Sequence, residues 1–132
     1  MLEFMVIGLV IFIALFVAAT KKGISSLGVR TKRMLSVAAK GSQESVLKSV
    51  IRFAQQSGYK VVALDEKRGH LVLEEPASLF SWGFFFPVFV SAQQDGSSLI
   101  EVGIKSKFSQ CGPVVSRSHE RFVTGLKAAL FE

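Results

Sequence analysis

The sequence predicts an α+β protein in which a single N-terminal transmembrane helix precedes a small two-layer domain. Three observations lead to this fold class: an uncharged apolar run near the N-terminus, two amphipathic helical segments, and two β-hairpins between those segments. The predicted domain has the order α-β-β-β-β-α, and both helices pack on one face of a four-stranded antiparallel sheet. The chain of 132 residues has room for one such domain.

The apolar run lies at residues 4–19, FMVIGLVIFIALFVAA, and contains no charged side chain. With its flanking residues it approaches the roughly 20 residues that cross a bilayer as a helix. Residues 1–20 are therefore predicted to be a transmembrane anchor. A cleaved signal peptide is the alternative, because VAA at 17–19 offers small residues for cleavage. Signal peptides carry positive charge before the apolar run, whereas only Glu3 precedes it here.

Residues 21–41 are predicted to form a basic juxtamembrane linker. Six Lys and Arg residues and no acid lie between positions 20 and 40. Basic flanks stay on the cytoplasmic side of a membrane, which predicts a single-pass protein of the inner (plasma) membrane with a cytoplasmic C-terminal domain. Basic side chains near the bilayer also attract anionic lipids. The candidate contacts for anionic lipid are Lys21, Lys22, Arg30, Lys32 and Arg33.

Residues 42–132 are predicted to form the α+β domain. Ser42 is a suitable N-cap for a helix whose apolar residues recur at helical spacing until Gly58. Four β-rich runs follow, at 59–65, 70–75, 84–94 and 99–107. Gly69 and the pair Asp95-Gly96 are turn signals that join these runs into two hairpins. A second amphipathic helix is expected after Pro113, with Phe122 on its apolar face.

Six of the eleven residues in LFSWGFFFPVF, at 79–89, are aromatic. Strand alternation places Phe84 and Phe86 on one face of the sheet and Phe85 and Phe89 on the other. One set can pack beneath the helices, and the other is left for the loop at 76–83, a membrane surface or a partner to cover. The predicted contact residues for a partner or membrane are Phe80, Trp82, Phe84, Phe85, Phe86 and Phe89. Pro87 lacks an N–H, which favours an edge strand or a bulge.

The sequence offers few groups for catalysis or metal binding. Cys111, His70 and His119 match no zinc spacing, and no third group is evident that would orient a Cys111–His119 pair. Glu74 and Glu75 are adjacent in a strand and point to opposite faces, so they cannot act as a carboxylate pair. We therefore expect no enzyme, no metal and no cofactor. Nucleic acid is not an expected partner, because six of the sixteen basic residues behind the net charge of +6 lie in the predicted linker.

These observations favour a non-enzymatic, single-pass membrane protein whose small domain is a protein-interaction module. Such a domain would serve as an accessory or assembly subunit of a membrane complex, bound to another membrane protein or to a second copy of itself. The alternative is a module at the membrane surface that binds lipid or another hydrophobic ligand. In that case helices and sheet would enclose an apolar cavity lined by Phe84, Phe86 and Phe122.

Overall fold

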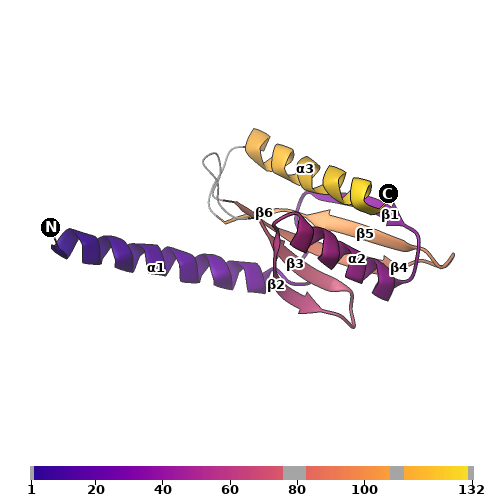
Figure 1. The fold of residues 1–132 in the computed structure, drawn as a ribbon, viewed down its shortest axis with the longest axis horizontal. Coiled ribbons are helices and arrows are strands. Elements are labelled where there is room, and N and C mark those ends of the chain that lie inside the picture. Colours follow the sequence, from indigo (N-terminus) through magenta and orange to yellow (C-terminus); the bar gives the residue numbers. More distant parts are fainter. Residues whose placement is uncertain (1, 76–82, 108–111, 131–132) are drawn as a thin grey trace.

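The structure, a computed structural model, is an α+β fold built on one antiparallel sheet (Figure 1). It describes residues 2–75, 83–107 and 112–130, without the side chains of residues 2, 12 and 14–21. The elements in chain order are α1 (Leu2–Ser25), β1 (Met34–Ala39), α2 (Gln43–Gln56), β2 (Lys60–Asp65), β3 (His70–Glu74), β4 (Phe84–Ala92), β5 (Ser98–Gly103), β6 (Lys105–Ser106) and α3 (Gly112–Leu130).

The sheet has the strand order β1-β5-β4-β3-β2, and the short β6 pairs with the beginning of β4. Every neighbouring pair is antiparallel. Because β1 and β2 are the two edge strands, α2 has to cross the sheet to connect them. Buried residues of α2 and α3 share one hydrophobic core with the sheet, so both helices cover the same face.

The predicted number of strands is wrong, because β1 was assigned to the linker. Its sequence, MLSVAA, is short and rich in small residues, which have little intrinsic preference for strands. Full pairing with β5, from Met34 opposite Gly103 to Ala39 opposite Ser98, holds it in the sheet. Val37 and Ala39 point into the core, and this edge strand starts the domain before residue 42.

The predicted helix after Ser42 is confirmed. The Ser42 hydroxyl accepts a hydrogen bond from the backbone N–H of Ser45 at 3.2 Å, as an N-cap does. Gly58 follows the helix with a φ of +84°, a conformation that glycine adopts without strain. The helix buries one stripe, which consists of Val46, Leu47, Val50, Phe53 and Ala54.

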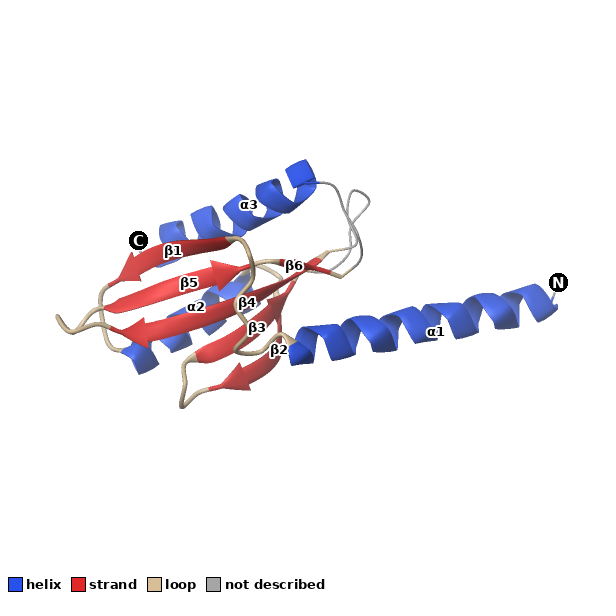
Figure 2. Ribbon diagram, turned by 180° about the vertical axis from the view of Figure 1, so that it is seen from behind, coloured by secondary structure: helices blue, strands red, loops and turns tan. Residues whose placement is uncertain are grey.

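The prediction of a transmembrane anchor is wrong: within the described part of the chain, no helix combines the length and apolar character needed to cross a membrane. The predicted single-pass topology and the predicted location in the inner (plasma) membrane depended on this anchor, so both predictions are wrong as well. The helix α1 instead projects from the domain (Figures 1 and 2), and its described apolar side chains between residues 4 and 13 are each more than half exposed.

The end of α1 packs against the second face of the sheet. A Cβ atom on Gly23 would lie only 2.5 Å from Cε1 of Phe85, so the helix backbone rests directly on that ring. Lys22 donates a hydrogen bond from Nζ to the carbonyl oxygen of Lys107, at 3.4 Å. The last turn of α1 therefore belongs to the domain.

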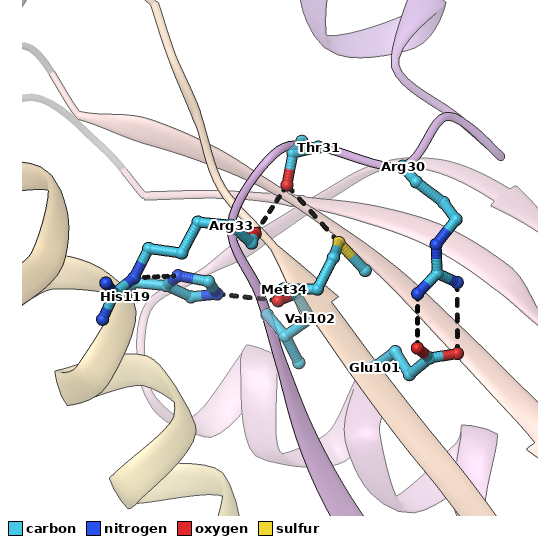
Figure 3. Close-up of polar contacts among 7 residues, drawn as sticks. All are labelled: Arg30, Thr31, Arg33, Met34, Glu101, Val102 and His119. Atoms are coloured by element: carbon cyan, nitrogen blue, oxygen red, sulfur yellow. Dashed lines mark hydrogen bonds and ion pairs between the residues drawn. The ribbon is translucent and has the colours of Figure 1, made fainter.

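Residues 26–33, which we call the strap, continue from α1 across the same face to β1 (Figure 2). Ser26 is buried, and its hydroxyl donates to the carbonyl oxygen of Gly23 at 2.6 Å. The Arg30 guanidinium lies 5.4 Å from the centre of the Phe89 ring and forms two hydrogen bonds with the Glu101 carboxylate (Figure 3). The predicted linker is thus a folded cover for the sheet.

Thr31 fixes the end of the strap. Its hydroxyl donates to the carbonyl oxygen of Arg33 at 2.7 Å and accepts from the backbone N–H of Ile104 at 3.2 Å. Ile104 lies between β5 and β6, where the pairing with β4 is interrupted. Thr31 therefore satisfies a backbone donor that the sheet leaves unpaired.

Pro87 lies in β4, which is a central strand between β3 and β5, so the predicted edge position is wrong. The predicted alternative, a bulge, is also not found, because the pairing with β3 continues through Pro87 without a register shift. Pro87 sits opposite Val72 of β3. On the other side of β4, the pairing with β5 ends where Val88 lies opposite Val102. The pairing with β6 begins only where Phe85 lies opposite Lys105. A proline is tolerated in the middle of this sheet because the neighbouring strand is broken beside it.

The contact between Gly23 and Phe85 generates a test of the covered face. We expect Gly23→Ala to destabilise the full chain by about 1–3 kcal/mol, because the fully buried ring must move to admit a methyl group. Urea denaturation followed by circular dichroism measures the change. Gly112→Ala is the control, since a Cβ atom there meets nothing within 4 Å. A Gly23→Ala protein as stable as the parent would contradict this packing.

Candidate functional site

Four aromatic rings meet between the helices and the sheet. Phe53 comes from α2, Tyr59 precedes β2, Phe86 lies in β4 and Phe122 in α3. Phe86 and Phe122 are stacked with ring centres 4.5 Å apart, and Tyr59 meets Phe122 edge-on at 4.9 Å. Phe53 approaches Phe122 edge-on at 5.6 Å. We call these four residues the aromatic cluster.

The stacked rings of Phe86 and Phe122 are both fully buried. Side chains thus occupy the place where the sequence predicted a cavity. A ligand that enters between α3 and the sheet has to displace at least one ring. Phe84 is also fully buried in the same core.

Glu75 brings a carboxyl group to one end of the aromatic cluster. It follows β3 directly, and its backbone N–H donates to the carbonyl oxygen of Phe84 at 2.8 Å. Strand alternation places Glu75 on the helix-covered face with Leu71 and Leu73, which both belong to the core. Extending the β2–β3 register by one residue places Tyr59 opposite Glu75.

The Glu75 carboxyl group is poorly satisfied. Its Oε2 atom is shielded from solvent and has no hydrogen-bond partner among the residues that the structure describes. Burial raises the pKa of the Glu75 carboxyl above its usual value, and the positive charges of Arg121 and Lys107 counteract that rise only in part. Unsatisfied buried acceptors are rare in proteins and cost stability.

Tyr59 is influenced by the same surroundings. Burial raises the pKa of its phenol, and the nearby Glu75 carboxylate raises it further. The phenol therefore stays neutral at physiological pH and keeps its O–H as a donor. Together, Tyr59 and Glu75 provide a hydroxyl and a carboxyl group beside three phenylalanine rings.

The basic residues near Glu75 are directed elsewhere. Lys107 forms an ion pair with Glu74, with Nζ and Oε2 3.0 Å apart, and its Nζ lies 5.5 Å from the centre of the Phe85 ring. Phe85 is on the opposite face of the sheet from the aromatic cluster. Arg121 is exposed on α3. Neither residue forms an ion pair with Glu75 in the described structure.

His119 is a fully buried polar residue of α3, and both of its ring nitrogens have hydrogen-bond partners. Its Nε2 lies 2.7 Å from the carbonyl oxygen of Val102, and its Nδ1 accepts a hydrogen bond from Nε of Arg33 at 3.1 Å (Figure 3). Because Nδ1 is the acceptor, Nε2 carries the proton and donates to Val102. Burial is the main cause that lowers the pKa of His119. With both ring nitrogens engaged, His119 has no free nitrogen for catalysis.

The predicted contact residues lie on both sides of the sheet. Phe84 and Phe86 are in the helix-covered core, while Phe85 and Phe89 lie beneath α1 and the strap. All four are buried, which removes the exposed strand face on which the docking hypothesis depended. Phe80 and Trp82 lie outside the described residues. The hypothesis of a single-pass accessory subunit fails on this burial and on the missing membrane-spanning helix.

The candidate lipid contacts also have structural partners. Lys22 donates a hydrogen bond to the backbone of Lys107, and Arg30 forms an ion pair with Glu101. Arg33 donates a hydrogen bond to His119 and forms an ion pair with Glu120. Lys32 is exposed, and the side chain of Lys21 is not among those described. Contact of these residues with anionic lipid remains a prediction.

Sequence reasoning did not identify Tyr59 and Glu75 as a site. The expectation that Glu74 and Glu75 do not form a carboxylate pair is confirmed, because the two lie on opposite faces of the sheet. A usable signal was present in HLVLEE, where alternation puts Glu75 on the same face as two leucines. A charged residue that continues an apolar face indicates a buried carboxyl group.

No metal centre is found in the described part of the chain, where no three His, Cys, Asp or Glu side chains form a suitable group. Cys111 lies outside that part, so its predicted relation to His119 is not described. Surface grooves of about 350–550 Å³ occur along α2 and at the β4–β5 turn. None of these three grooves is lined by a ring of the aromatic cluster.

Comparisons with known proteins show the fold. The matching solved structures include the crystal structure of Ara h 8.0201, which has a Bet v 1-like fold. The similarity covers 74% of this chain and 92% of that chain, with a TM-score of 0.53 and 11% sequence identity. No family model matches the sequence, and no curated protein is significantly similar to it. At this identity the shared fold does not carry a function.

The unsatisfied carboxyl group generates a stability test. The folded-state pKa of Glu75 is raised, so its contribution favours folding at low pH and is lost as the pH rises through that pKa. We expect Glu75→Gln to stabilise the protein at pH 7 by about 1 kcal/mol, because it removes a poorly solvated charge that is still partly screened by solvent.

Urea denaturation at pH 7 and pH 4 measures this effect, and the gain should shrink at pH 4, where the parent carboxyl group is protonated. Glu74→Gln is the matched control. It should give no gain, because it removes a carboxylate that is paired with Lys107. Equal effects of the two substitutions at pH 7 would contradict the assignment of Glu75 as the unsatisfied group.

His119 generates a separate pH test. Its folded-state pKa is lowered, so the neutral ring favours folding above the unfolded pKa of about 6.5, and this contribution is lost as the pH falls. The free energy of unfolding should decrease below pH 6.5 with a limiting slope of about 1.4 kcal/mol per pH unit. His119→Gln should flatten the curve between pH 7.5 and 5.5. An unchanged slope in that variant would show that another group titrates.

Proposed function

We propose that this domain binds a small hydrophobic molecule, such as a lipid, between α3 and the sheet, and that it does so without catalysis. The observation that carries the proposal is the aromatic cluster with a carboxyl group at its end. Ligand sites are mostly apolar and aromatic, with a few polar groups that orient the ligand. The aromatic cluster brings together rings from both helices and from the sheet. Tyr59 adds a hydroxyl group, and Glu75 beside the cluster adds a carboxyl group.

The energetic cost of Glu75 supports a role beyond packing. A core that serves stability alone is expected to contain satisfied polar groups, as His119 is, or apolar side chains. Glu75 leaves an acceptor shielded from solvent and unpaired within the described structure. Groups that cost stability are frequently retained for function. The similarity in fold to Ara h 8.0201 is compatible with this proposal, but it does not identify a ligand.

The packing of the rings sets the binding mode. Because Phe86 and Phe122 are in contact, the ligand has to take the place of a ring that moves aside. Binding thus couples to a rearrangement of α3 or of the Phe122 side chain. The apparent affinity is reduced by the free energy of that opening.

Titration with the neutral fluorescent dye N-phenyl-1-naphthylamine tests the proposal on the full chain. We expect saturable binding of one dye per chain. Phe122→Leu should tighten binding several-fold, because space left by the ring no longer has to be opened. Phe89→Leu is the matched control on the opposite face of the sheet, and it should leave the affinity unchanged.

The exposed apolar residues of α1 are a second place where dye could bind. The triple variant Phe4→Ser, Ile7→Ser, Ile11→Ser removes part of that surface, which lies away from the aromatic cluster. Saturable binding should survive in the triple variant. Loss of all binding in that variant, or equal effects of Phe122→Leu and Phe89→Leu, would refute a ligand site between α3 and the sheet.

A further inference from the structure

We infer that the ligand carries a neutral hydrogen-bond donor, such as the hydroxyl group of an alcohol or phenol, and that this donor binds Oε2 of Glu75. The inference rests on the proposed function and specifies the chemical class of the ligand. It starts from the one described side-chain atom that is buried, polar and without a hydrogen-bond partner. In its ionised form a carboxyl group only accepts hydrogen bonds, so this oxygen is satisfied by a donor.

The surroundings of Glu75 favour a donor that arrives with an apolar body. Its cross-strand neighbours on the helix-covered face are Tyr59 and Phe84. Phe84 is fully buried, and Tyr59 leads on to the rings of Phe86 and Phe122, at 5.8 and 4.9 Å. A flat or elongated apolar molecule that lies along these rings would bring a polar end group to Glu75.

Charge discriminates between possible end groups. A carboxylate ligand would meet the like charge of Glu75, which Arg121 and Lys107 offset only in part, because Lys107 is paired with Glu74 and Arg121 is exposed. An ammonium group would form an ion pair in a poorly solvated place, where desolvation opposes the attraction. A hydroxyl group donates one hydrogen bond without either cost, and the raised pKa of Glu75 is consistent with a weakly solvated acceptor.

Competition against the bound dye with 2-naphthol and 2-methoxynaphthalene tests the inference. The two probes share the same ring system, but only 2-naphthol has a donor. In the parent protein, the concentration of 2-naphthol that displaces the dye should be lower than that of 2-methoxynaphthalene by a factor of about five or more. This difference is expected for one added hydrogen bond. In Glu75→Leu the two probes should become equivalent. Glu75→Gln keeps an acceptor oxygen and should retain a preference for 2-naphthol.

The outcomes separate the two levels of the proposal. If the dye itself does not bind saturably to the parent protein, the proposed function fails and this inference fails with it. If the dye binds but neither probe displaces it, this inference alone fails. If both probes displace it equally in the parent and in Glu75→Leu, ligand binding stands and the role of Glu75 is refuted. Tighter binding of 2-naphthoate or of 2-naphthylmethylamine than of 2-naphthol would likewise overturn a neutral donor in favour of an ionic partner. Circular dichroism of both variants verifies that each retains the parent fold.

Discussion

Burial of β4 on both faces is the constraint on which the rest of the structure depends. The aromatic residues of this central strand point alternately to opposite sides, Phe84 and Phe86 toward the helices and Phe85 and Phe89 away from them. All four are buried, so a single layer of helices cannot complete the fold. A second cover is required, and the chain supplies it from its own N-terminal side. Apolar surface of this size is rarely left exposed in a monomer.

The second cover uses backbone and basic side chains more than apolar ones. Gly23 lets the α1 backbone approach the Phe85 ring, and Arg30 lies over Phe89 while its charge is held by Glu101. Long basic side chains can cover apolar surface with their stems and keep their charged ends in contact with water or with a carboxylate. This dual use explains how a stretch that resembles a basic linker in composition forms part of a folded domain.

Two polar residues on the helix-covered side of the sheet, the buried His119 and the half-buried Glu75, have opposite roles. His119 links three parts of the chain, because Arg33 precedes β1, Val102 lies in β5 and His119 itself lies in α3. Its hydrogen bonds are complete, so it adds specificity to the docking of α3. The hydrogen bonds of Glu75 are incomplete, because its Oε2 is shielded from solvent and has no partner among the described residues. His119 therefore serves the fold, whereas Glu75 is the group that we propose binds a ligand.

The sequence by itself determined the α2 helix, the two hairpins and the α+β class, because these depend on local patterns: helical periodicity, an N-cap at Ser42, and glycine at the turns. It also determined that the phenylalanines of 84–89 divide between two faces, since alternation is a property of any strand. The sequence did not reveal β1, whose small residues are strand-like only when paired with β5. Tertiary structure also decided that the strap covers Phe89 and that Glu75 is left without a partner. Both outcomes depend on contacts between residues that are far apart in the chain, and local propensities and spacing carry no information about such contacts.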